Sequence, residues 1–200
     1  MVKITSLSEE EIEQIGEAFA YYDYADGEKG MSFAYDGKES VKEYICGYAR
    51  AMLKGGCLYS TSENHEAFIA YRCSKDKLSF SANMELLRAF LKTLGFGGAI
   101  KMLKAVKKGG KSYEDDYKKT KKPYIFVGMV VVRKQFQGLG YMRKVLDIAF
   151  DEGKRRNCPV LLETDAILKR DKYVHLGMEN VRTRRVGEGA VLYDLVKEND

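Results

Sequence analysis

The segment best suited to chemistry is a turn with two glycines, Gly138 and Gly140, between an apolar run and an amphipathic stretch. The apolar run, Tyr124 to Val132, is rich in β-branched and aromatic residues and predicts a buried central strand. After the turn, apolar residues three and four positions apart predict a helix. A strand, a glycine turn and a helix start bring free backbone N–H groups together, and the helix macrodipole adds positive potential there. The turn therefore predicts a site for an anion such as phosphate.

The same turn lacks two common nucleotide-binding patterns. It has neither the lysine nor the hydroxyl of GxxxxGK[ST], which argues against a nucleoside triphosphatase, and it does not supply the GxGxxG of a dinucleotide-binding unit. A phosphate that carries some other group remains the expected ligand. The alternative is a tight turn from strand to helix that binds nothing.

Other reactive side chains are few. His65 and His175 are the only histidines and lie far apart in the chain, so neighbours in the sequence cannot build a zinc site. The four cysteines occur singly, never as CxxC, and predict reduced thiols. We expect no metal, and a nucleophile activated by histidine is disfavoured.

Length and composition limit the class of protein. The chain has 200 residues, of which 45% are hydrophobic, enough to bury one core and too apolar for a disordered protein. Its 34 Lys and Arg against 29 Asp and Glu give a net charge of +5, well short of a polycationic scaffold for nucleic acid. No apolar run approaches the roughly 20 residues that a membrane-spanning helix requires. The N-terminal residues have no leader pattern, so we expect a cytoplasmic protein.

Hydrophobic periodicity predicts the elements that position the turn. Ser8 and Glu11 have the spacing of a capping box, which starts a helix, and Gly55 with Gly56 ends a second one. In chain order the pattern predicts these two helices, a hairpin of strands 57–60 and 67–71, the central strand, a helix from Met142 to about Gly153, a strand 160–162, a helix 168–176 and a last strand 190–196. This order predicts one mixed α/β domain over residues 1–200.

A helical insert, about 83–122, interrupts this order before the central strand. It contains two apolar stripes separated by Gly95, Gly97 and Gly98, and eleven Lys and Arg against four acids, a local charge of +7. We expect a solvated basic face over an apolar stripe that packs on the core. The alternative is a patch for a membrane surface or a nucleic acid, although we expect no nucleic acid partner.

Two segments resemble a known family. The stretch VVVRKQFQGLGYMRKVL resembles motif A of the GNAT superfamily of acyl-CoA-dependent N-acyltransferases, whose pattern is Gln or Arg, two residues, Gly, one residue, and Gly or Ala. We align Gln137, Gly140 and Met142 to this pattern, with Met142 departing from Gly or Ala; the other register uses Gln135, Gly138 and Gly140.

The stretch LLETDAILKRDKYVHLGM resembles the family's motif B. Tyr173, Leu176, Gly177 and Met178 match that motif without a gap, whereas Ala166 stands where many members have Asn. Together the two motifs cover about 124–178. The resemblance implies a GNAT-like mixed α/β fold and an N-acetyltransferase that takes acetyl-CoA.

The resemblance also implies where coenzyme A binds. The amides from Gln137 to Met142 would hold the pyrophosphate, and the free backbone of Met129 to Val132 would pair with the pantetheine arm, beside Thr164 on the neighbouring strand. The implied binding residues are Val130, Val132, Gln137, Gly138, Leu139, Gly140, Tyr141, Met142 and Thr164.

The reaction implied is direct attack of an amine on the thioester. Tyr173 would give a proton to the departing thiolate, because the pKa values of a phenol, about 10, and a thiol, about 8.5, are close enough for transfer. A backbone N–H near Val132 would stabilise the oxyanion. Glu163 is a weakly placed general base, and water is the alternative. We expect His175 to face away from Tyr173.

The acceptor is the least determined part. Tyr22, Asp23, Tyr24 and Asp26 lie in a segment that borders the acceptor cleft in the family and would suit an amine cation; the alternative is a polar loop. The expected acceptor is a primary amine of a small molecule or peptide. A second interpretation keeps the fold without the reaction, as a coenzyme A sensor or an interaction module that uses the basic insert. A homodimer is left open.

Overall fold

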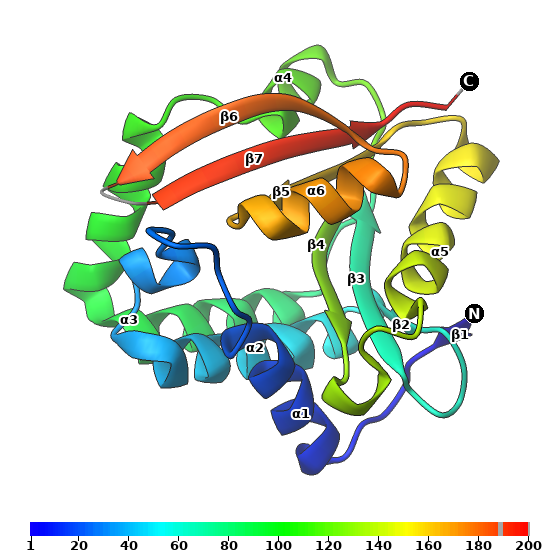
Figure 1. Ribbon diagram of the computed structural model, residues 1–200, viewed down its shortest axis with the longest axis horizontal. Helices are drawn as coiled ribbons and strands as arrows, with labels where there is room; N and C mark the ends of the chain where they lie inside the picture. The colour runs from blue at the N-terminus through cyan, green and yellow to red at the C-terminus, as the bar shows by residue number, and fades with distance from the viewer. Residues whose placement is uncertain (188–189, 200) are drawn as a thin grey trace.

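The computed structural model describes residues 1–187 and 190–199, with the side chains of 32 and 187 left out. Within these residues one sheet contains seven strands in the order β1-β2-β3-β4-β5-β7-β6 (Figure 1). Strands β4 and β5 are parallel, and the other neighbours are antiparallel. The strands are β1 (Val2–Lys3), β2 (Leu58–Ser60), β3 (Ala67–Cys73), β4 (Ile125–Val132), β5 (Val160–Thr164), β6 (Glu179–Gly187) and β7 (Ala190–Lys197). The helices are α1 (Glu9–Ala20), η1 (Gly30–Phe33), α2 (Gly37–Lys54), α3 (Phe80–Lys108), α4 (Tyr113–Thr120), η2 (Lys134–Phe136), α5 (Tyr141–Arg156) and α6 (Ile167–His175).

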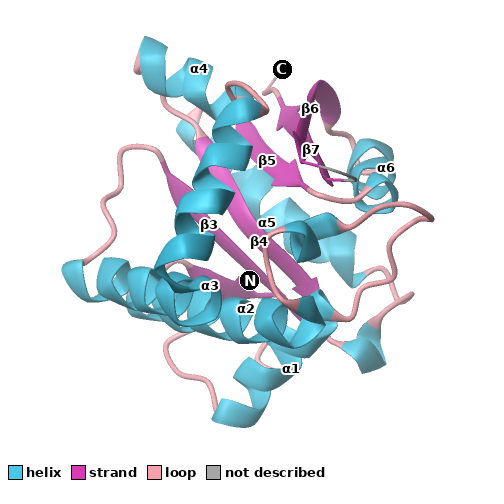
Figure 2. Ribbon diagram, turned by 90° about the vertical axis from the view of Figure 1, so that its left-hand side faces the viewer, coloured by secondary structure: helices cyan, strands magenta, loops and turns pink. Residues whose placement is uncertain are grey.

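Helices cover both faces of the sheet (Figure 2). Helices α1 and α2 pack on one face through residues such as Ile15 and Ile45, which meet Phe68 and Val131 of the strands. Helices α5 and α6 cover the other face, where Leu146 and Tyr173 join the cluster around Ile125 and Leu162. The mixed α/β class predicted from the sequence is confirmed.

Short sequence patterns predicted where helices begin and end. The Ser8 hydroxyl accepts a hydrogen bond from the Glu11 N–H at 3.2 Å, and the Glu11 carboxylate accepts one from the Ser8 N–H at 2.8 Å. This capping box satisfies two N–H groups that a helix start leaves unpaired, and α1 begins directly after it. Helix α5 extends to Arg156, three residues past the stop expected near Gly153.

The basic insert is helical, as its periodicity predicted. Its first helix, α3, has a non-helical residue at Gly95, where φ is 61° and ψ is 172°, and α3 packs along α2. The prediction that glycines break the insert into two stripes is therefore confirmed, with the break at Gly95. None of the described helices is long and apolar enough to cross a membrane.

Strand β6 was not predicted. Its sequence carries Arg182, Arg184 and Arg185 and lacks the alternation of a half-buried strand. In the fold, Arg184 is only 4% exposed, and its guanidinium binds Asp194 of β7 at 2.9 Å and also the Glu163 carboxylate of β5. A long-range ion-pair cluster, which the local pattern cannot reveal, links this strand to β7 and β5.

Strand β4 contains a bulge next to the site. Ala70 pairs with Met129 and Tyr71 with Val127, so Gly128 is the extra residue. A Cβ at Gly128 would overlap the Tyr48 hydroxyl, so only glycine leaves room there for the side chain from α2.

Strands β4 and β5 separate at their carboxyl ends. Their pairing covers only Ile125–Val127 with Val160–Leu162, although β4 continues to Val132 and β5 to Thr164. Figure 1 shows the two strands side by side at their start and diverging beyond. The sheet therefore has a gap in its middle, and no strand of the described residues pairs with β4 beyond Val127 on that edge.

Candidate functional site

The glycine turn leaves backbone donors free. Gly138 and Gly140 have φ values of 79° and 78°, a region that other residues seldom adopt, and Gly140 caps the start of α5. Among the described residues, the N–H groups from Gly138 through Arg143 have no acceptor. The Gln137 N–H already donates to the Lys134 carbonyl oxygen at 3.3 Å. Of the amides from Gln137 to Met142 that were expected to bind the pyrophosphate, the first is therefore not free.

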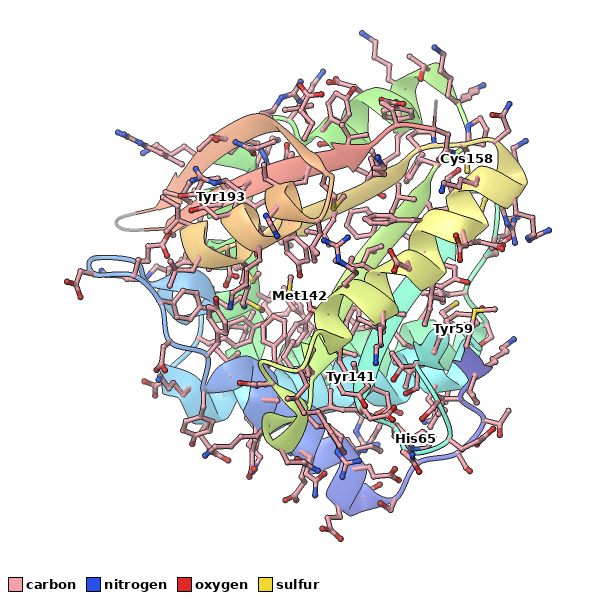
Figure 3. All side chains as sticks on the ribbon, turned by 45° about the vertical axis from the view of Figure 1, so that its right-hand side comes forward. Tyr59, His65, Tyr141, Met142, Cys158 and Tyr193 are labelled. Atoms are coloured by element: carbon pink, nitrogen blue, oxygen red, sulfur yellow. The ribbon has the colours of Figure 1, made fainter. Side chains whose placement is uncertain are left out.

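The turn has room for an anion. No atom beyond the immediate chain neighbours lies within 4 Å of the position that a Cβ of Gly138 or Gly140 would take. Figure 3 shows Tyr141 and Met142 where the turn passes into α5. The unpaired amides and the open space fit a phosphate, and a turn plugged by side chains would not.

The two registers of the glycine motif differ in what the backbone requires. Both positive-φ residues, Gly138 and Gly140, are the glycines of the register that starts at Gln135. In the register that starts at Gln137, Met142 falls in the first turn of α5, where no glycine is needed. Either way the free amides belong to the same turn.

The exposed edge of β4 adds two more donors. The Arg133 N–H donates to the Glu66 carbonyl oxygen at 3.0 Å, on the side of β3. Because backbone groups alternate in direction along a strand, the N–H groups of Val132 and Val130 face the gap instead. The Gln137 side-chain amide donates to the Val132 carbonyl oxygen at 3.1 Å and ties the turn to this edge.

Two cavities meet at the gap. One, of about 300 Å³, extends from Val130 and Val132 to the glycine turn and Met142. The other, of about 270 Å³, lies towards α2 and α3. Four residues line both cavities: Phe19, Val130, Lys169 and Tyr173. The two cavities therefore share a wall at the gap in the sheet.

Tyr173 lies at this junction, where the sequence placed the proton donor. Its side chain is buried, and its hydroxyl has no hydrogen-bond partner among the described residues. Burial, with the negative charge of Asp165 nearby, raises the pKa of Tyr173 well above its ordinary value. The phenol therefore stays protonated at neutral pH, but it is a weaker acid than a free tyrosine, so its pKa is further from that of a thiol than the sequence argument assumed.

Lys169 is the residue that sequence reasoning missed. It lies one helical turn before Tyr173 on α6, and its Nζ is buried 3.5 Å from the Asp165 Oδ1. The rings of Phe19, Tyr22 and Tyr24 surround the same Nζ, with centroids at 4.4, 4.5 and 5.4 Å. The spacing of Asp165, Lys169 and Tyr173, each four residues apart, was a signal that could have found it, because such residues share a helix face.

The predicted acceptor segment is brought only partly to the site. Tyr22 lines the 300 Å³ cavity on the side of the turn, and the Tyr24 hydroxyl donates to the Asp165 Oδ2 at 2.8 Å. Asp23 and Asp26 are exposed and line neither cavity. The rings of Tyr22 and Tyr24 in this segment lie against the amino group of the chain's own Lys169.

Of the remaining predicted residues, some line a cavity and others do not. Thr164 and Glu163 line the 270 Å³ cavity at the end of β5, but the Glu163 carboxylate is engaged with Arg184. Leu139 is 63% exposed on the outside of the turn. His65 binds Glu11 at 2.6 Å and His175 is exposed, and neither lines the two cavities.

The wall of the 270 Å³ cavity is mostly apolar. Met102 and Val106 from α3 line it, together with aromatic residues such as Phe33 and Tyr44. The insert thus shapes this cavity through apolar residues of α3.

Comparisons with known proteins support the fold. No model of a protein family matches the chain, and no curated protein matches it by sequence. Solved structures do match over nearly the whole chain. A polyamine N-acetyltransferase from Drosophila melanogaster that forms N-acetylagmatine is 12% identical with a TM-score of 0.58, covering 97% of this chain and 98% of that one. An arylalkylamine N-acetyltransferase 2 from Aedes aegypti is 10% identical with a TM-score of 0.57, covering 98% and 97%.

Another match is an agmatine N-acetyltransferase variant in its apo form, 13% identical with a TM-score of 0.57, covering 96% of this chain and 97% of that one. A partial match is a putative acetyltransferase from Agrobacterium tumefaciens, with a TM-score of 0.36 and 20% identity; it covers 38% of this chain and 57% of that one. The full-length matches show that the chain has the fold of the GNAT N-acetyltransferases, as the two motifs predicted.

Proposed function

We propose that the protein is an acyl-CoA-dependent N-acyltransferase that transfers an acetyl group from acetyl-CoA to a primary amine of a small molecule. The observation that carries the proposal is the meeting of two cavities in the gap between β4 and β5, with unpaired amides at the far end of one of them. The proposal treats the chain as one catalytic domain, because strands from both ends of the chain share the sheet.

The donor would bind on the turn side. The N–H groups from Gly138 to Met142 would hold a diphosphate at the start of α5, where the helix dipole favours negative charge. The backbone of Val130 would pair with an amide of the pantetheine arm, as an added strand does, and this leaves the Val132 N–H for the reacting carbonyl group. Acetyl-CoA would supply an acyl group already activated as a thioester.

The residues at the junction would support the transfer. Tyr173 would donate its phenolic proton to the sulfur of the leaving group, because its unpaired hydroxyl belongs to a side chain that lines both cavities. The Val132 N–H, which faces the gap, would stabilise the negative charge that develops on the carbonyl oxygen. Glu163 is a poor base here, because Arg184 binds its carboxylate.

The acceptor would bind in the 270 Å³ cavity. Its size suits a small molecule better than a folded peptide, and its apolar wall favours an amine attached to an apolar group. The matched enzymes act on polyamine, agmatine and arylalkylamine substrates, which supports the same general class of acceptor.

Two measurements test the proposal. Acetyl-CoA and desulfo-CoA should raise the unfolding temperature, whereas ADP should raise it far less, because it lacks the pantetheine arm. Thiol release should then be followed with a panel of 2-phenylethylamine, tyramine and agmatine. Tyr173→Phe should lower kcat by more than about tenfold and leave acetyl-CoA binding unchanged.

The outcomes separate the alternatives. Stabilisation by acetyl-CoA without turnover of any amine would favour the coenzyme A sensor. Absence of stabilisation by any coenzyme A form would remove the donor site and the transferase with it.

A further inference from the structure

A direct transfer needs an acceptor for the proton of the amine as well as a donor for the thiolate. Amines are mostly protonated at neutral pH, and an ammonium group has no lone pair with which to attack. Tyr173 accounts for the donor, and Glu163 is held by Arg184. Among the described residues that line both cavities, Tyr173 and Lys169 are the ones that titrate.

We propose that Lys169 is the proton acceptor for the incoming amine. The proposal rests on the transferase function proposed above. Lys169 and Tyr173 are one turn apart on the same face of α6, so a base and an acid are both directed to the junction where the amine and the thioester would meet.

The surroundings of Lys169 suit both of its charge states. Its Nζ is buried and donates no hydrogen bond to any residue that the structure describes. This burial lowers the pKa of Lys169 from its ordinary value, which favours the neutral amine. Once a proton arrives, the Asp165 carboxylate at 3.5 Å and the rings of Phe19 and Tyr22 stabilise the ammonium.

Three charged groups of the described residues influence the charge of Lys169: Asp165, Glu28 and Lys172. Asp165 precedes α6, and the Tyr24 hydroxyl fixes its carboxylate by a 2.8 Å hydrogen bond. Glu28 caps α6 through the Ile167 N–H at 2.9 Å and adds negative charge, while Lys172 on α6 adds positive charge. The uncharged faces are the rings of Phe19, Tyr22 and Tyr24.

The protons balance as follows. Lys169 takes one proton from the acceptor ammonium and later releases it to solvent. The neutral nitrogen forms the N–C bond, the C–S bond breaks, and Tyr173 gives its proton to the sulfur. The second proton lost by the nitrogen restores the phenol, so the sum is an amide, a thiol and one released proton.

The first experiment needs no acceptor. The full-length protein is labelled with ¹³C at lysine Cε and titrated by NMR, with signals assigned through Lys169→Met and Lys154→Met. Lys154 is an exposed lysine near the end of α5 and serves as the reference. We expect Lys169 to titrate at a lower pH than Lys154. A midpoint equal to or above that of Lys154 would overturn the proposal.

The second experiment uses kinetics with acetyl-CoA and 2-phenylethylamine, or another panel amine that the wild type acetylates. Lys169→Arg keeps a cation that cannot release its proton, and Lys169→Met removes the charge. Both variants should lower kcat/KM about a hundredfold. They should also remove the fall of kcat/KM at low pH that the wild type shows, and leave the affinity for acetyl-CoA unchanged. Lys154→Met should behave as the wild type.

The Asp165→Asn variant distinguishes a proton acceptor from a residue that only supports the structure, because only a proton acceptor would shift the pH dependence of kcat/KM. Because the ammonium of Lys169 loses its carboxylate partner, the acid limb of kcat/KM should shift to lower pH. A wild-type profile in Lys169→Arg, or an acetyl group found on Lys169 itself by mass spectrometry, would contradict the role. If acetyl-CoA binds and Lys169→Arg is fully active, the proton acceptor fails while the transferase stands; if the wild type acetylates no amine, both fail.

Discussion

The side-chain amide of Gln137 donates a hydrogen bond to the backbone carbonyl oxygen of Val132 at 3.1 Å. This contact joins the turn that would hold a diphosphate to the strand edge that would hold the pantetheine arm. It also leaves the Val132 N–H as the free group of that residue on the gap side. The Gln137 side chain thus adds to the backbone hydrogen bonds of the loop that fix the two halves of the donor site relative to each other.

Gln137→Ala should loosen this connection. The turn would lose the bond that fixes it to β4, so we expect acetyl-CoA to bind about three- to tenfold more weakly, the cost of one hydrogen bond. Isothermal titration calorimetry measures the affinity. Gln135→Ala, in η2 of the same loop, is the matched control and should change it little; equal losses in both variants would show that the contact has no special part.

Gly140→Ala should destabilise the start of α5. An alanine at a φ of 78° costs about 1–2 kcal/mol, and no neighbouring atom adds a clash. Gly97 offers a matched control, because it lies in α3 with helical angles and open space around it. Gly97→Ala should stabilise the protein by up to about 1 kcal/mol. Chemical denaturation measures the free energy of unfolding of both variants. An unchanged value for Gly140→Ala would show that the position does not require glycine.

Glu152 should give the fold part of its acid sensitivity. Hydrogen bonds from Arg155, with further support from Arg156, lower the pKa of Glu152 from 4.5 to about 2. A carboxyl group whose pKa is lower in the folded state stabilises the fold fully above its unfolded pKa and loses this contribution as pH falls through its folded pKa. The wild type should therefore lose stability more steeply than Glu152→Gln between pH 4.5 and 2. The difference should not exceed about 1 kcal/mol, because the arginines are partly solvated. Parallel pH profiles of unfolding for the two proteins would contradict this assignment.

The sequence predicted the parts of the site that are local. The capping box at Ser8, the buried run before Val132 and the glycine turn each signal their structure within a few residues. The turn at Gly138 and Gly140 needed only the preference of glycine for positive φ and the unpaired amides of a helix start.

Long-range pairing accounts for what the sequence did not reveal. Arg184 links strand β6 to Asp194 of β7 and Glu163 of β5, and no periodic pattern records such contacts. The cage around Lys169 brings Phe19 from α1 to α6, far away in the chain. The free carboxylate expected at Glu163 was lost to the same arginine, because charge pairing depends on which strands become neighbours.

Val106 offers a test of the acceptor cavity that leaves the donor side intact. Its side chain comes from α3 and lines the 270 Å³ cavity but not the 300 Å³ one. Val106→Phe should fill part of the acceptor space, so we expect KM for 2-phenylethylamine to rise about tenfold while the acetyl-CoA affinity stays the same. Leu103→Phe, at an exposed position on the same helix, is the matched control and should leave both constants unchanged. Steady-state kinetics with varied amine, together with calorimetry for acetyl-CoA, separates the two effects. A loss of acetyl-CoA affinity in Val106→Phe, with KM for the amine unaltered, would mean that the acceptor and donor cavities have been assigned the wrong way round.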